Sequence, residues 1–178
     1  MILYKREPGK KSKYWEIWEN DGKLYTHLGV IGCLGKTHDT LINDPANVES
    51  LIEKNVRHAI ARGYHELIPE YLIVIQREVD GGGTIRDDEL RHAVEDLMDE
   101  CLGSTGNGYC DGGVSGEGYS NVFCCVVDLE AGLKTAFEVL KDEDVLDEFV
   151  IASRKIANED DDYVVYWPTN LVRRLITF

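Results

Sequence analysis

Hydrophobic and polar residues alternate near the start of the chain as they do in half-buried β-strands. In an extended segment, Trp15 and Ile17 fall on one side, while Tyr14, Glu16 and Trp18 fall on the other. Asn20-Asp21-Gly22 then predicts a hairpin turn, because Asn and Gly tolerate positive φ. The pattern therefore predicts a strand through residues 14–17, a partner strand over 23–30, a short edge strand over 2–7 and a weaker strand over 36–42.

After these strands, apolar residues recur at helical spacing. Asp44 is placed to cap a helix whose first position is Pro45, and Gly63 is the expected C-terminal stop. We therefore predict an amphipathic helix over residues 45–62, with a buried face made of Val48, Leu51, Ile52, Val56, Ala59 and Ile60.

The rest of the chain predicts a second set of strands and helices. Residues 71–78 form a strand, and Thr84 with Asp87 has the form of a capping box at the start of a helix. We interpret the glycine-rich residues 103–118 as a strand paired with residues 120–128. A helix from Leu129 to Leu140 follows, and then strands over 148–155 and 161–167, joined by an acidic turn at 158–162. The resulting order is the βαββαβ order of a ferredoxin-like domain with one strand added, and it requires the glycine-rich segment to be a strand.

Several of these strands are apolar on both faces. The segments concerned are residues 71–75, 122–127, 149–151 and 163–167. A ferredoxin-like sheet has helices on one face only, so we expect the second face to be covered as well. The first domain, a second copy of the chain in a homo-oligomer, or another protein could cover it.

Charge is unevenly distributed along the 178 residues, whose formal net charge is −14. Residues 1–68 carry a net charge of +1 and residues 69–178 carry −15. We therefore predict an α+β protein of two packed domains, 1–68 and 69–178. The acidic second domain should repel phosphate backbones and attract basic surfaces.

Three features of the first domain occur together: Tyr14-Trp15-Glu16-Ile17 in a strand, Gly29-Val30-Ile31-Gly32 with Gly35, and a helix ending at Gly63-Tyr64. In these features the domain resembles the WGR domain, a small sheet-plus-helix module of poly(ADP-ribose) polymerases and of many short bacterial proteins. Where the family has Trp-Gly-Arg, this chain has Leu28-Gly29-Val30, so only the glycine matches. In DNA-binding members that motif helps to hold a nucleic-acid end, and its loss weakens the expectation of DNA binding.

The sequence favours a cytoplasmic protein and gives little sign of catalysis. The five cysteines are an odd number, and two of them, Cys124 and Cys125, are adjacent, which argues against a disulfide framework and favours a reducing compartment. The N-terminus lacks the apolar core of a signal peptide, and the longest apolar run, residues 122–127, is too short for a membrane span. Asp80-Gly81-Gly82-Gly83 between a strand and a helix suggests a phosphate loop, but no Gly-Lys-Ser/Thr follows, so we expect a turn there. His27, Cys33 and His38 could meet in space, but no cysteines or histidines have the paired short spacings of a zinc site, and no activated nucleophile is recognisable. We expect no cofactor, no metal and no enzymatic activity, although a co-purified ligand in the glycine-rich region would revive the idea of an enzyme.

Two binding hypotheses follow. The first is a non-catalytic protein that binds a basic protein partner, for example a bacterial immunity or antitoxin protein that masks a basic toxin. Tyrosines beside carboxylates on a glycine-rich backbone suit such recognition, and the candidates are Tyr109, Asp111, Glu117 and Tyr119. The WGR-like loop adds Leu28, Val30 and Lys36 as binding candidates. The alternative is nucleic-acid binding by the first domain through Lys10, Lys11, Lys13, Lys36 and Arg57.

Overall fold

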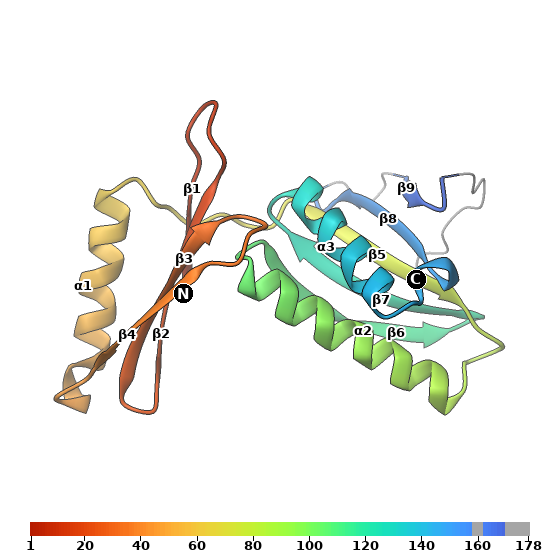
Figure 1. Cartoon of the computed structure of the whole chain (residues 1–178), viewed down its shortest axis with the longest axis horizontal. Helices are drawn as coiled ribbons and strands as arrows, with labels where there is room; N and C mark the ends of the chain where they lie inside the picture. Colours follow the sequence, from red (N-terminus) through yellow and green to blue (C-terminus); the bar gives the residue numbers. More distant parts are fainter. Residues whose placement is uncertain (158–161, 170–178) are drawn as a thin grey trace. The chain divides into compact units, whose positions relative to one another are not determined.

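The computed structural model describes residues 1–157 and 162–169 (Figure 1). Its contacts divide the chain into two compact units: Met1–Ile68 with Ser104–Gly106, and Pro69–Gly103 with Asn107–Phe178. Each unit contains one antiparallel sheet, with one α-helix in the first unit and two in the second among the described residues, so the predicted α+β class is confirmed.

The first unit is built on a four-stranded sheet in the order β1-β2-β3-β4. The strands are β1 (Ile2–Lys5), β2 (Lys13–Asn20), β3 (Lys23–Val30) and β4 (Lys36–Leu41). Asp21 and Gly22 form the β2–β3 turn, with φ values of 49° and 71°, as a two-residue hairpin with the right-handed twist of its strands requires. The predicted hairpin is confirmed, with Asn20 as the last strand residue.

One helix follows this sheet. A short 3₁₀ turn, η1 (Pro45–Asn47), leads into α1 (Val48–Ala61), and Asp44 accepts a hydrogen bond from the amide of Ala46. Trp15 and Ile17 pack with Ala59 of α1 in a buried cluster. Trp18 lies on the other face of the sheet and stacks on Tyr25, with 5.4 Å between the ring centroids. The side chains of β2 therefore lie on opposite faces of the sheet, as the alternation in the sequence predicts.

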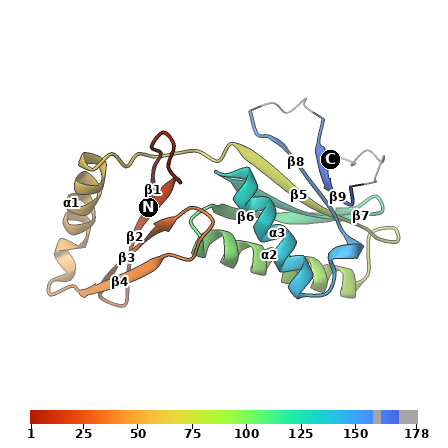
Figure 2. The ribbon, with the colours of Figure 1, turned by 45° about the horizontal axis from the view of Figure 1, so that its top comes forward.

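The second unit has a five-stranded antiparallel sheet in the order β6-β7-β5-β8-β9. The strands are β5 (Tyr71–Glu78), β6 (Gly108–Gly116), β7 (Tyr119–Val126), β8 (Val150–Lys155) and β9 (Val164–Trp167). Helix α2 (Ile85–Ser104) connects β5 to β6, and α3 (Leu129–Asp142) connects β7 to β8 (Figure 2). Each helix thus joins two strands that have a third strand between them. Within the glycine-rich segment predicted as a strand, residues 108–116 form β6, whereas Gly103 and Ser104 end α2 and residues 105–107 and 117–118 lie in turns or a bend.

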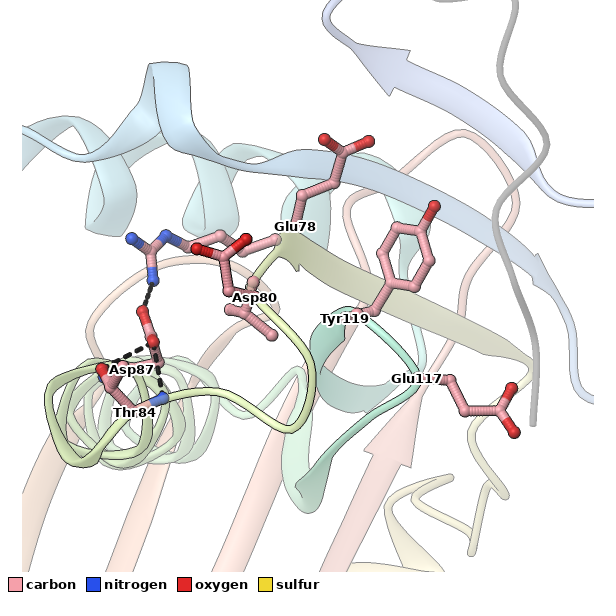
Figure 3. Close-up of a pocket in the computed structure, with 9 residues that line it drawn as sticks. Glu78, Asp80, Thr84, Asp87, Glu117 and Tyr119 are labelled. Carbon is pink, nitrogen blue, oxygen red and sulfur yellow. Dashed lines mark hydrogen bonds and ion pairs between the residues drawn. The ribbon is translucent and has the colours of Figure 1, made fainter.

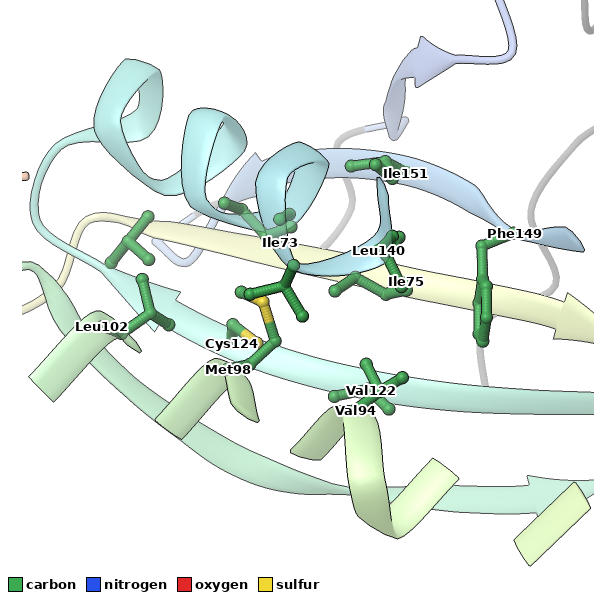
Figure 4. Close-up of a cluster of buried hydrophobic side chains, with 13 residues drawn as sticks. Ile73, Ile75, Val94, Met98, Leu102, Val122, Cys124, Leu140, Phe149 and Ile151 are labelled. Atoms are coloured by element: carbon green, nitrogen blue, oxygen red, sulfur yellow. The ribbon is translucent and has the colours of Figure 1, made fainter. Parts of the chain in front are cut away.

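Both helices contribute to a single core (Figure 4). Alternate residues of the sheet point into it, including Ile73 and Ile75 of β5 and Cys124 of β7. Met98 of α2 and Leu140 of α3 are fully buried in the same cluster. Since the helices and one set of alternate strand residues share this cluster, α2 and α3 cover one face of the sheet.

The other set of strand residues is also buried but is more polar than the apolar runs predict. Val74 and Ala152 have exposed fractions of 4% and 0%. Beside them Gln76 donates a hydrogen bond of 2.8 Å from its side-chain amide to Asn121 Oδ1, across β5 and β7. The hydrogen bond partly satisfies two amides that would otherwise be costly to bury on this face.

Two boundaries near the end of the chain differ from the prediction. The strand predicted over 148–155 begins only at Val150, because Leu146–Glu148 form a 3₁₀ turn, η2, in which Phe149 donates to the carbonyl of Leu146. The last strand begins at Val164 instead of residue 161. Except for Asp162, the predicted acidic turn at 158–162 lies outside the described residues. Within the described ranges, no helix combines the length and the apolar character needed to cross a membrane.

Candidate functional site

The four residues predicted to bind a partner in the second unit separate into two pairs. Tyr109 and Asp111 lie near the start of β6, whereas Glu117 and Tyr119 lie at the turn between β6 and β7. An extended strand rises about 3.3 Å per residue, so the eight-residue step from Tyr109 to Glu117 spans up to about 26 Å. The structure therefore does not bring the four residues into one site.

The candidates in the first unit lie at the end of β3 and the start of β4. Leu28 is opposite Lys36, and Val30 is opposite Lys13. Leu28 packs against the buried cluster beneath α1, whereas Lys36 is exposed. Of these candidates, Leu28 and Val30 are thus half-buried and Lys36 is exposed.

Glu117 and Tyr119 line a cleft of about 440 Å³ in the second unit (Figure 3). The cleft lies where β5 ends, beside the start of α2 and the β6–β7 turn. Its lining consists of Arg77, Glu78, Val79, Asp80, Thr84, Asp87, Glu117, Gly118 and Tyr119. Four carboxylates and one guanidinium are thus present in a single cleft.

Backbone hydrogen bonds hold the two loops of the cleft together. Glu117 and Gly118 both have positive φ, 51° and 86°, which gives the tight hairpin turn between β6 and β7. Gly118 donates to the carbonyl of Gly81 at 2.8 Å, and Val79 donates to the carbonyl of Gly118 at 2.9 Å. The walls are therefore positioned by the main chain rather than by flexible side chains alone.

The positive charge of the cleft is already paired. The Arg77 guanidinium binds Oδ1 of Asp87, and its Nε donates to Glu148 Oε2 at 2.9 Å. Arg77 thus has two carboxylate partners, and the net charge of the lining is negative.

Asp87 is also the carboxylate of the capping box predicted from the sequence, in which Thr84 is the capping residue. The Thr84 hydroxyl and the Thr84 amide each donate to Asp87 Oδ2 at 2.7 Å. These hydrogen bonds, with the Arg77 guanidinium, lower the pKa of Asp87 to about 2. Asp87 is therefore ionised at neutral pH, and its oxygens are engaged in stabilising the start of α2.

Three other carboxylates remain around the cleft. Glu78 is opposite Tyr119 in the β5–β7 ladder, and Figure 3 shows their side chains extending from adjoining strand ends. Asp80 follows on the loop after β5, and Glu117 extends from the hairpin turn at the rim. An aromatic ring beside carboxylates can bind a cationic side chain by ion pairing and by cation–π attraction.

The chain matches no family model, no curated protein and no solved structure. Evidence on function therefore comes from the chain's own chemistry. In the part of the chain that the structure describes, no three His, Cys, Asp or Glu side chains are grouped to hold a metal ion. The features of the cleft that could bind a ligand are its carboxylates, the Tyr119 ring and a backbone held by hydrogen bonds.

Sequence reasoning did not identify Glu78 and Asp80 as neighbours of Glu117 and Tyr119. The signal was present, because the predicted βαββαβ order brings the end of the first strand beside the start of the third in an antiparallel pair. Glu78 ends β5 and Tyr119 begins β7. The two acidic residues at the end of residues 71–80 could therefore have been assigned to the same site.

Proposed function

We propose that the chain is a non-catalytic binding protein whose partner is a basic protein surface, and that the acidic cleft receives a lysine or arginine side chain. The observation that supports this most directly is the charge balance of the cleft. The guanidinium of Arg77 has two carboxylate partners, while Glu78, Asp80 and Glu117 add three further carboxylates to the lining. Residues 69–178 carry a net charge of −15, which would steer a basic surface toward this unit.

The cleft is large enough to receive a long cationic side chain. A volume of about 440 Å³ falls in the lower part of the range of small-ligand pockets, roughly 300–1,000 Å³. The Tyr119 ring can contact the aliphatic stem or the charged head, and the carboxylates can accept its hydrogen bonds. A general base needs a pKa near the working pH, and Asp87, with a pKa of about 2, is far from that condition.

A peptide titration followed by NMR would test the proposal. The probe is a short peptide containing Lys and Arg, with a control peptide in which both are replaced by Gln. Binding in the cleft should shift the backbone amides of residues 80–84 and 117–119 selectively, and added salt should weaken it.

A matched pair of double variants isolates the cleft from overall charge. Asp80→Asn with Glu117→Gln should abolish the selective shifts. Asp142→Asn with Glu143→Gln removes the same charge from exposed positions at the end of α3 and should leave the shifts in place. Shifts spread over the whole unit, or equal losses in both double variants, would contradict binding in the cleft.

A second candidate function, nucleic-acid binding by the first unit, is favoured by a group of basic residues. Lys5 and Lys13 are opposite each other on β1 and β2, and Lys5 Nζ donates to the carbonyl of Arg62 at 2.9 Å. Lys36, also exposed, lies two strands from Lys13 at the same end of the sheet, roughly 10–12 Å away. Such a group can pair with phosphates.

Titration of the full chain with single-stranded or nicked DNA at low salt would test this candidate. Binding should weaken steeply as salt is added, and Lys13→Gln with Lys36→Gln should reduce both the affinity and the salt dependence. Unchanged binding in this double variant, or no binding at low salt, would remove the candidate.

A further inference from the structure

Two cysteines of the second unit lie directly opposite each other on neighbouring strands. Cys110 of β6 is paired with Cys124 of β7 in the antiparallel ladder. Both residues are on the face of the sheet that packs against α2 and α3, where Cys124 belongs to the core and Cys110 packs against it. All five cysteines of the chain are in the free thiol form.

The hydrogen-bond pattern places this pair at a non-hydrogen-bonded position of the ladder. Val127 donates to the carbonyl of Asn107, three residues before Cys110, and the Cys110 amide donates to Asp99 Oδ1 at 3.0 Å instead of to β7. At such positions the Cα atoms of opposite residues are about 4.5 Å apart and their side chains are close. A disulfide requires a Cα separation of about 4.4–6.8 Å, and the usual separation at such a position falls within this range.

The two thiols also interact with each other. A hydrogen bond between the two side chains lowers the pKa of Cys110 and raises that of Cys124 well above its ordinary value. Cys124 is fully buried, whereas Cys110 is half-buried on the edge strand β6. An oxidant would therefore reach Cys110 first, and Cys110 is also the thiol that ionises more readily.

We propose that Cys110 and Cys124 are a redox-active pair that forms an internal disulfide when the chain meets a small disulfide such as glutathione disulfide. Cys110 loses its proton, and its sulfur attacks one sulfur of glutathione disulfide, whose S–S bond breaks to release glutathione. Cys124 then loses its proton, and its sulfur attacks the Cys110 sulfur of the mixed disulfide, releasing a second glutathione. Two cysteine thiols are oxidised to one disulfide, one glutathione disulfide is reduced to two glutathiones, and the two protons are taken up by the leaving thiolates.

The bond would fix a part of the sheet that is irregular in the reduced form. Immediately after Cys110 the register shifts, so that Asp111 and Gly112 together oppose Phe123 alone. A covalent link at Cys110 would tie the edge strand to β7 on one side of this bulge. The proposed bond goes beyond the binding function, and its formation does not depend on any partner.

Equilibration of the full chain in glutathione redox buffers would test the proposal. After rapid alkylation of the remaining thiols, peptide mapping should find Cys110 joined to Cys124, with the intact mass lowered by two hydrogen atoms. The ratio of oxidised to reduced protein should fall with the square of the glutathione concentration at fixed glutathione disulfide. A mixed disulfide would give only the first power.

Two variants make the assignment specific. Cys110→Ser, at a half-buried position, should eliminate the internal disulfide, while Cys33→Ser, at an exposed position, should leave it unchanged. Circular dichroism on each variant checks that it is folded. Glutathione attached to Cys33 alone, a bond between any other two cysteines, or complete alkylation of Cys110 and Cys124 in the oxidising buffers would overturn the proposal.

Discussion

Gly108 is the position in the glycine-rich strand where a side chain should be tolerated least. Its φ is 154°, a conformation that L-residues rarely adopt. A Cβ added here would overlap the carbonyl oxygen of Cys125 and approach Val126 Cα to 3.0 Å. Both contacts are with the backbone of β7, so no rotamer change can relieve them. Gly108→Ala should therefore destabilise the second unit.

The expected loss combines two costs. A non-glycine residue held in such a region of φ costs about 1–3 kcal/mol, and an overpacked site costs about 1–3 kcal/mol more. The free energy of unfolding should therefore fall by about 2–6 kcal/mol, out of the roughly 5–15 kcal/mol typical of a whole domain. Gly116 provides a control on the same strand, because a Cβ there meets no atom within 4 Å and its φ is not positive. Gly116→Ala should change stability by no more than about 1 kcal/mol.

Urea unfolding followed by far-ultraviolet circular dichroism would measure both variants. Hydrogen exchange of peptides from residues 119–126 would assign the change to the sheet of the second unit. A loss of less than about 1 kcal/mol in Gly108→Ala relative to Gly116→Ala would refute the close approach of β6 to β7 at this position, since the two costs above could not then both apply.

Three further results are expected. Met98→Ala, at a core position with an exposed fraction of 0%, should reduce the free energy of unfolding by about 2–5 kcal/mol in the same urea assay. Because the folded pKa of Asp87 is lowered from 3.8 to about 2, its stabilising effect is present above pH 4 and is lost as the pH falls toward 2; Asp87→Asn should flatten this part of the acid-unfolding curve. Burial raises the pKa of Tyr4 and Tyr14 from 10.0 to about 12, so their contribution to stability is present below pH 10 and is lost as the pH rises through 12. Ultraviolet absorbance should show both phenols protonated at pH 11, and Tyr14→Phe should remove one late-titrating group.

The order of helices and strands could be predicted from the sequence because each element carries its own local signal. The alternation around Trp15, the turn at Asp21-Gly22 and the capping box of Thr84 with Asp87 all act over a few residues. The start of β8 was predicted two residues early. Phe149 is apolar and buried like a strand residue, but its amide closes the 3₁₀ turn η2 and leaves Val150 to begin the strand.

The candidate site was harder to predict from the sequence than the fold was, because its position depends on which strands pair. Tyr109 and Glu117 are close in sequence, but the rigid extension of β6 separates them. Glu78 and Tyr119 are 41 positions apart in the chain, and the pairing of β5 with β7 makes them neighbours. The charge and aromatic content of the segment suggested a basic protein as the partner. The location of the binding site could be assigned only from the pairing of the strands.

The sign of the charge in the cleft follows from the register of β5. Successive strand residues point to opposite faces, so Arg77 lies on the helix side, where it binds Asp87 and Glu148, and Glu78 lies on the other side beside Tyr119. A register slip of one residue would exchange the faces of Arg77 and Glu78. The guanidinium would then lie beside Tyr119, and the Glu78 carboxylate would lie beside two other carboxylates, those of Asp87 and Glu148. That slip would also turn Ile73 and Ile75 out of the core, bring the amide of Gln76 into the core and remove that amide from Asn121. The register of β5 therefore determines both how the strand packs and which charge faces the Tyr119 side of the cleft, where we propose that a cationic side chain binds.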